Sequence, residues 1–153
     1  MTIFSSYCNS ILSNLTRSMA DKVNVVLAHE SGIKKVPIDK PYVAIGIKKC
    51  SLSSPIIQKN EDGADITNGD RKVQTTVSIN IYTPYSKGAK GCVEIYEEVL
   101  DSILLGLREA LVETRLFGTK YSRETQCIVG ESEFVFETIL SDFVSVEPIV
   151  SGK

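Results

Sequence analysis

The stretch that most constrains the fold is residues 71–82, where two kinds of side chain alternate strictly. Successive side chains of a β-strand point to opposite faces, so this alternation predicts a strand with one buried and one wet face. A Pro/Gly loop at residues 83–90 and a long amphipathic segment follow, which predicts a helix that covers the buried face. The buried set is Val73, Thr75, Val77, Ile79 and Ile81, and the wet set is Gln74, Thr76, Ser78, Asn80 and Tyr82.

The amphipathic segment predicts one helix over residues 91–113. Its apolar stripe is expected to face the sheet, and its acidic residues are expected to face solvent. Three apolar residues, Ile95, Leu105 and Val112, fall off the main stripe and predict a second contact face. The stripe consists of Cys92, Tyr96, Val99, Leu100, Ile103, Leu107 and Leu111, and the outer face of Glu94, Glu97, Glu98, Asp101, Arg108 and Glu109.

Periodicity also predicts the other elements. Apolar residues at four-residue steps indicate an N-terminal helix over residues 2–20, and β-branched runs indicate strands at 23–27 and 41–53. The polar connection 54–70 is expected to form the extended tip of an antiparallel hairpin between the strand 41–53 and the strand 71–82.

The C-terminal third predicts a turn region over residues 116–125 and a short strand at 126–129. A hairpin turn at Gly130 and Glu131 is expected to lead into residues 133–146. The probable core side chains there are Phe134, Phe136, Phe143 and Val144. A shift in the apolar phase near Ile139 and Leu140 predicts a bulge or break.

The fold class that follows is α+β in a single domain, residues 1–153. Its expected architecture is a mixed or antiparallel sheet with a long β-hairpin, packed against an N-terminal helix and a long central amphipathic helix. A domain of this size can bury a sufficient core without a disulfide or metal.

Composition excludes several function classes. The formal net charge is −2 and the isoelectric point is near 5.5, which disfavours nucleic acid as the main ligand. No apolar run approaches the ~20 residues of a membrane span, and the N-terminus lacks the pattern of a secretory signal. The scattered cysteines, Cys8, Cys50, Cys92 and Cys127, form no CxxC pair and do not favour a zinc site.

No motif indicates catalysis. His29 is the single histidine and has no recognisable nucleophile near it in the sequence. Gly88 and Gly91 precede a helix but do not complete a phosphate-binding GxxxxGK[ST] motif. We therefore expect no catalytic residue, no cofactor and no metal, and the protein is not expected to be an enzyme.

Two charged features remain as candidate contact sites. The acidic residues Glu61, Asp62, Asp65 and Asp70 could hold a divalent cation, but they do not match an EF-hand. A solvated loop, or one ordered by a partner, is the preferred interpretation. Lys48, Lys49, Lys87 and Lys90 form small basic spots that can stay solvated or pair with acidic groups on a neighbouring subunit.

The segment VQTTVSINIYTPYSKGAKGCVEIYEEVLDSIL, residues 73–104, resembles the tail terminator (tail completion) proteins of long-tailed phages and phage-derived contractile particles. The shared pattern is an alternating strand, a Tyr-Pro-Tyr-Ser-Lys-Gly-like corner and an acidic amphipathic helix. The order of the predicted elements is also similar to that family.

The resemblance implies a structural protein that closes into a homohexameric ring on the tail tube. Such a ring ends tube growth, presents a surface to neck or connector proteins, contacts the sheath in contractile tails, and lets DNA pass through its lumen. It belongs to the virion tail or phage-like particle, is assembled in the bacterial cytoplasm, and involves no membrane. Candidate subunit or tube contacts are Lys48, Lys49, Glu61, Asp62, Asp65, Asp70, Arg71, Tyr85, Lys87 and Lys90.

Three alternatives stay open. A head–tail connector or neck subunit shares this small α+β design. A small hydrolase or nucleotide-binding domain would need a role for His29 or a pocket around the acidic loop. A monomeric adaptor domain would show no ring in solution.

Overall fold

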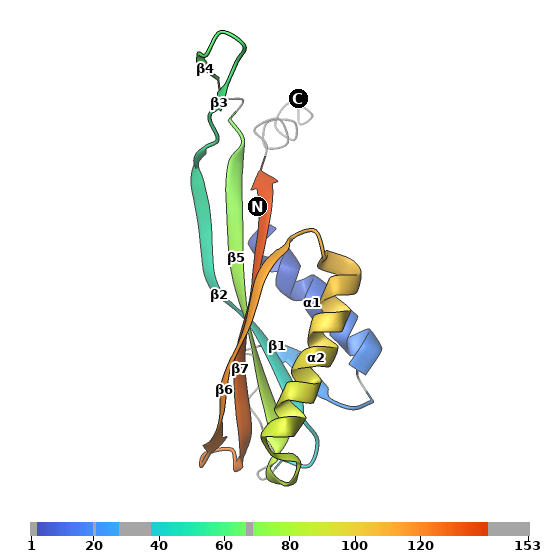
Figure 1. The fold of residues 1–153 in the computed structure, drawn as a ribbon. Coiled ribbons are helices and arrows are strands. Elements are labelled where there is room, and N and C mark those ends of the chain that lie inside the picture. Colours follow the sequence, from blue (N-terminus) through green and yellow to red (C-terminus); the bar gives the residue numbers. More distant parts are fainter. Residues whose placement is uncertain (1–2, 20, 28–37, 67–68, 141–153) are drawn as a thin grey trace, which may run out of the picture.

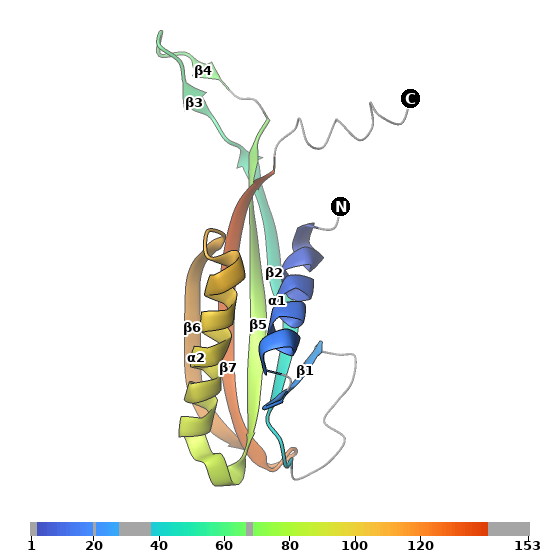
Figure 2. The same cartoon turned by 90° about the vertical axis from the view of Figure 1, so that its right-hand side faces the viewer.

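The computed structural model describes residues 3–19, 21–27, 38–66 and 69–140, with side chains from Ser6 onward. Two helices, α1 (Ile3–Met19) and α2 (Gly88–Leu107), pack on one face of a five-stranded sheet (Figures 1 and 2). The α+β prediction is confirmed. The strands of the sheet are β1 (Asn24–Leu27), β2 (Tyr42–Pro55), β5 (Arg71–Pro84), β6 (Leu111–Ser122) and β7 (Cys127–Leu140).

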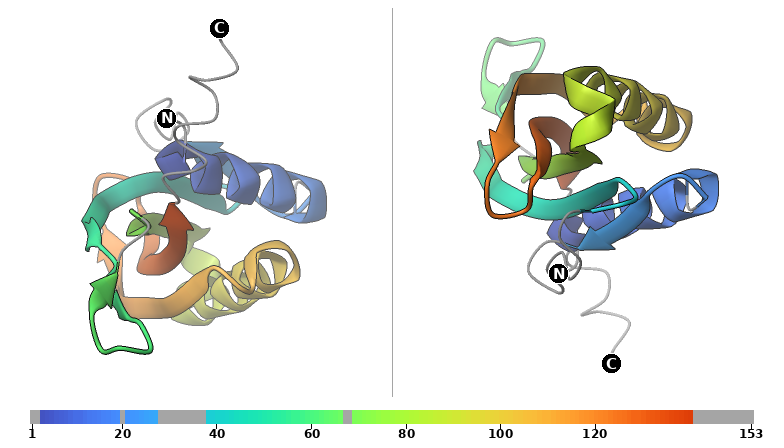
Figure 3. Two further views of the ribbon diagram at one scale, coloured as in Figure 1. Left: turned by 90° about the horizontal axis from the view of Figure 1, so that it is seen from above. Right: turned by 90° about the horizontal axis from the view of Figure 1, so that it is seen from below.

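The sheet is mixed, as expected, with the order β1-β2-β5-β7-β6. β1 runs parallel to β2, and all other neighbours are antiparallel. β5 lies at the centre and pairs along its length with β7. Long strands twist strongly, and the view along them in Figure 3 shows both helices on the same side of the curved sheet.

The predicted long hairpin is confirmed. β2 and β5 pair antiparallel and continue past the helices, as Figures 1 and 2 show. At the far end, β3 (Gln58–Lys59) and β4 (Asp65–Ile66) form a small two-stranded ribbon. We call residues 56–66 the tip.

The alternation in β5 sets the core, as predicted. Its five apolar-face residues, Val73 to Ile81, are all fully buried, and Thr83 continues the series. The opposite face is half-buried along the same strand. Tyr7 of α1 stacks on Phe136 of β7 with ring centroids 4.8 Å apart, which joins the two layers. The described part of the α1 stripe is also buried: Tyr7, Cys8, Ile11, Leu15 and Met19.

The central helix is shorter than its apolar pattern predicts, because it ends at Leu107 instead of residue 113. Gly106 closely approaches α1: an added Cβ would lie 2.9 Å from Asn14 Nδ2. After a short turn, Leu111 pairs with Phe136, so strand pairing replaces the last predicted helical turn. The expected second apolar line is therefore wrong: Ile95 is buried, Leu105 is 90% exposed, and Val112 belongs to β6.

β6 occupies most of the segment predicted as a turn region. It pairs with β7 from Leu111 to Ser122, with register shifts after Leu111 and after Leu116. Gly118 lies within the register shift between Leu116 and Thr119, whereas the sequence placed it in a turn. The reversal comes at residues 123–126, where Gln126 has a φ of 50°.

β7 is one continuous strand, so the hairpin turn predicted at Gly130 and Glu131 is wrong. Gly130 pairs with Ile81 and Thr119 inside the sheet. An added Cβ would lie 3.2 Å from Cys92 Cβ, so this glycine serves the close approach of α2. The predicted bulge near Ile139 is also wrong, because β5 and β7 pair without interruption to Leu140. Phe143 and Val144 lie outside the described residues.

Candidate functional site

The structure divides the ten predicted contact residues among three regions and does not bring them into one site. Glu61, Asp62 and Asp65 lie on the tip. The corner, residues 84–91, carries Tyr85, Lys87 and Lys90 and lies at the opposite end of the elongated molecule (Figure 1). The remaining four are called the arm base: Lys48 and Lys49 lie in β2 beside Thr76 of β5, and Asp70 and Arg71 lie at the tip-side start of β5.

The tip is a turn with its own hydrogen bonds. Asn60 Oδ1 accepts from the backbone N–H groups of Asp62 and Ala64 at 3.0 and 2.9 Å. Gly63 has a φ of 82°, a conformation that glycine adopts without strain. The tip therefore presents its side chains from a turn with a defined backbone.

The side chains of the tip combine exposed charge with exposed aliphatic surface. Ile57 is 63% exposed and Ile66 is 47% exposed. Lys59 and Asp65 form an ion pair at 2.6 Å, whereas the carboxylates of Glu61 and Asp62 make no ion pair among the described residues. The unpaired acids of the turn and the exposed isoleucines at the base of the ribbon make the tip a candidate contact surface.

The arm-base residues form an ion pair and hydrogen bonds within the chain. Lys48 Nζ lies 3.0 Å from Glu133 Oε2 and 5.9 Å from the centroid of the Phe117 ring. Arg71 Nη1 donates to Ser53 O at 3.1 Å, and Ile56 N donates to Asp70 O at 2.7 Å. Three of the four arm-base residues thus hold the hairpin together, which makes them weaker candidates for partner contacts.

The corner exposes one aromatic ring and two lysines. Tyr85 lies in the 3₁₀ turn η1 (Tyr85–Lys87) and is 69% exposed. Its ring and the Tyr121 ring form an edge-to-face pair with centroids 5.6 Å apart. Lys90 lies 3.8 Å from Glu94, a weak i,i+4 pair. Lys87 makes no ion pair among the described residues, so its charge is available to another molecule.

Close packing fixes the position of the corner. Cys92 Sγ and Thr83 Oγ1 are 3.3 Å apart inside the protein. An added Cβ at Gly91 would lie 2.9 Å from Lys87 Cβ, so the chain passes close to itself there. Gly88 has a φ of 63°, which lets η1 turn directly into α2.

A pocket of about 320 Å³ lies beside the corner, and we call it the corner pocket. Its apolar wall includes Val23 and Ile95, which are 2% and 8% exposed. Lys22 and Glu98 pair across 3.7 Å at its rim. The full lining is Lys22, Val23, Pro41, Lys87, Gly91, Glu94, Ile95 and Glu98. The lining carries two lysines and two glutamates. Glu98 pairs with Lys22 and Glu94 pairs with Lys90, so Lys87 is the lining charge that has no ion pair among the described residues. The apolar wall suits an aliphatic side chain, and Lys87 suits an acidic group beside it.

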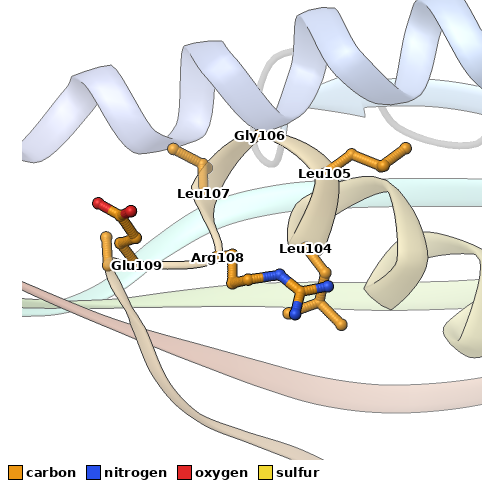
Figure 4. A pocket seen from close by; sticks show the side chains of 7 residues that line it. Leu104, Leu105, Gly106, Leu107, Arg108 and Glu109 are labelled. Carbon is orange, nitrogen blue, oxygen red and sulfur yellow. The ribbon is translucent and has the colours of Figure 1, made fainter.

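A second hollow of about 340 Å³ lies where α2 gives way to β6. Figure 4 shows its side chains projecting from one continuous stretch of chain, residues 104–110. Leu105 is the most exposed large apolar residue there. Active sites usually combine polar groups from several elements, and this hollow draws on one segment alone.

Among the described residues, two buried thiols and one surface carboxylate have a shifted pKa that bears on reactivity. Burial raises the pKa of the Cys8 and Cys92 thiols, which favours the unreactive protonated form. A hydrogen bond from Arg115, at 2.8 Å, lowers the pKa of the surface residue Glu113. Within the described residues, no group of three or more His, Cys, Asp or Glu side chains could hold a metal ion. His29 lies outside the described residues.

The sequence-based search missed the aliphatic residues of the tip. Ile57 and Ile66 stand at the two ends of a polar connection, and this was the available signal. It also missed Phe117, whose ring centroid lies 5.9 Å from Lys48 Nζ and gives this exposed lysine a second partner within the chain.

No protein-family model and no curated protein matches this chain. Among the described helices, none combines the length and the apolar character required to cross a bilayer.

Proposed function

We propose that this protein is a structural assembly subunit: a tail terminator that closes into a six-membered ring on a tail tube and ends tube growth. One observation carries the proposal more than any other. The subunit is elongated, and the tip and the corner lie at its opposite ends (Figure 1). The tip carries Glu61 and Asp62, and the corner carries Lys87 and Lys90. The partners would be further copies of the chain, the tube protein, and sheath and neck or connector proteins.

A ring requires two different, complementary patches on each subunit, because a head-to-tail contact generates a cycle when its rotation closes. The tip supplies unpaired Glu61 and Asp62, and the corner supplies unpaired Lys87. The tip carboxylates and Lys87 cannot form ion pairs within one chain, since the body of the molecule lies between them.

The shape of the hairpin supports the same proposal. The tip ribbon projects beyond the helices and buries none of its own side chains (Figure 2). A two-stranded hairpin alone is marginally stable in water, so a projecting one gains most when it contacts another molecule. In a terminator, that molecule is the next subunit or the tube.

The charge balance also suits a ring around a DNA channel. The chain carries 19 acidic and 17 basic residues, so its surface does not attract the phosphate backbone overall. The outer face of α2 adds exposed Glu94, Glu97 and Asp101. A surface of this kind lets DNA pass without retaining it.

The test is to add the purified protein to growing tubes made from tail-tube subunits of the same particle. The proposal predicts one ring at one end of each tube in negative stain and arrest of elongation. Native mass spectrometry of that cap should give six copies of the 16.8 kDa chain, about 101 kDa. Binding along the tube wall, or elongation at an unchanged rate, would overturn it.

A further inference from the structure

We propose that the tip of one copy docks into the corner pocket of the next, with Ile57 in the pocket and Glu61 and Asp62 facing Lys87 and Lys90. This contact rests on the proposed ring and names the surfaces that close it. The occupant of the pocket is a second copy of this chain.

The tip contributes the inserted side chain. Ile57 is the most exposed large aliphatic residue on the hairpin, at 63%, and Ile66 follows at 47%. Ile66 pairs with Gln58, so it lies on the same face of the ribbon as Gln58. Ile57 lies just before β3 (Gln58–Lys59) and is the more exposed of the two isoleucines. The proposed contact therefore uses Ile57 and leaves Ile66 outside the pocket.

The corner pocket contributes the receiving surface. Val23 and Ile95 give it an apolar wall that an aliphatic side chain would shield from water. Lys87 lies on its lining, and Lys90 follows one helical turn later. Glu61 and Asp62 lie in the turn that follows β3, and in the proposed contact they face the lysines at the rim.

Charge complementarity selects a second copy as the partner. The tip carboxylates Glu61 and Asp62 and the ammonium of Lys87 have no ion-pair partner among the described residues. The tip and the corner lie at opposite ends of the molecule (Figure 1), so these charges do not meet within one chain, whereas two copies can bring them together. Complementary charge at a rim fixes register and partner choice.

The experiment is disulfide trapping between two partners that each carry one introduced cysteine, in a Cys50→Ser background that removes the exposed native thiol and keeps the three buried ones. One copy carries Asp62→Cys and the other carries Lys87→Cys. Oxidised glutathione is the oxidant: it accepts two electrons as the two thiols lose their protons and form one disulfide. The control replaces Lys87→Cys by Asp101→Cys, an exposed site on the outer face of α2.

The inference predicts that the tip–corner heterodimer forms about tenfold faster than the control pair, because docking raises the effective concentration of the two thiols. Ile57→Ser should reduce trapping by a similar factor, and Ile66→Ser should leave it nearly unchanged. Equal rates for both pairs, or equal effects of both serine substitutions, would overturn the inference.

Charge reversal gives an independent test on intact assemblies. Asp62→Lys and Lys87→Asp should each prevent ring formation, and the combined variant should restore it. If wild-type hexamers form while these substitutions change nothing, the contact is wrong and the ring function stands. If trapping succeeds but copies form open chains instead of hexamers, the contact stands and the terminator function is lost.

Discussion

Lys48 of β2 and Glu133 of β7 pair across the central strand β5, with Nζ and Oε2 3.0 Å apart. The register shift after Ile47 supplies the extra residue that lets the lysine reach across. The Glu133 side chain is only 14% exposed, so solvent screens this ion pair less than it screens a fully exposed one. Lys48 therefore belongs to the fold of the hairpin rather than to its contact surface.

Lys48→Met should lower the free energy of unfolding by about 1 kcal/mol, since it leaves a largely covered carboxylate without its cation. Lys49→Met is the matched control, because Lys49 is exposed and makes no ion pair among the described residues. Urea unfolding at two salt concentrations measures both. Equal effects of the two substitutions would show that the pair across β5 contributes nothing.

Gly130→Ala should destabilise the protein by about 1 kcal/mol, because the added Cβ would lie 3.2 Å from Cys92 Cβ and Cys92 on α2 would have to shift by a few tenths of an ångström. Gly118→Ala is the comparison: a Cβ there meets nothing within 4 Å, so its cost should stay under about 0.5 kcal/mol. Thermal unfolding of the two variants separates them. Similar melting temperatures would contradict the close approach of α2 to β7.

Thiol labelling of the native protein should modify Cys50 first. Cys50 is exposed, whereas Cys8, Cys92 and Cys127 are buried. Mass spectrometry after brief treatment with iodoacetamide should find one labelled site, and labelling in urea should find all four cysteines. Early modification of Cys92 would mean that the packing of α2 on the sheet is wrong.

The free energy of unfolding should decrease at alkaline pH. Burial raises the pKa of Cys92 and Cys8, and also that of Tyr7, in the folded state. The stabilising contribution of each group is complete below its unfolded pKa, about 8.5 for a thiol, and is lost as pH rises through the folded value. Urea midpoints should therefore decrease above about pH 8.5, and less steeply in Cys92→Ala. A midpoint that does not change with pH up to 10 would contradict this.

Sequence patterns predicted β5 well, because one of its faces is fully buried and a register slip would expose every apolar residue. They failed at the end of α2. Leu107 and Leu111 keep the helical spacing, and only the pairing of Leu111 with Phe136 decides that the second belongs to a strand. Pairing with a segment far along the chain is not visible in local periodicity.

Gly130 illustrates a second limit. Glycine followed by a charged residue is a reasonable turn signal, but here the small residue makes room for Cys92 on α2. The need for that room arises only after the helix has packed on the sheet. For the same reason the strand was predicted as two pieces.

The candidate surfaces were predicted residue by residue but not in space. The acids of the tip and the lysines of the corner stand out in the sequence as unpatterned charge. Their position at opposite ends follows from the length of the paired strands β2 and β5. Ile57 was overlooked because a single apolar residue in a polar connection carries no periodicity.

The most direct test of the terminator proposal is to image particles from cells that lack this protein. Negative-stain micrographs should then show tail tubes of uncontrolled length, and supplying the protein in trans should restore one uniform length. Tubes of normal length without attached heads would indicate a connector role. Particles indistinguishable from wild type would contradict the account.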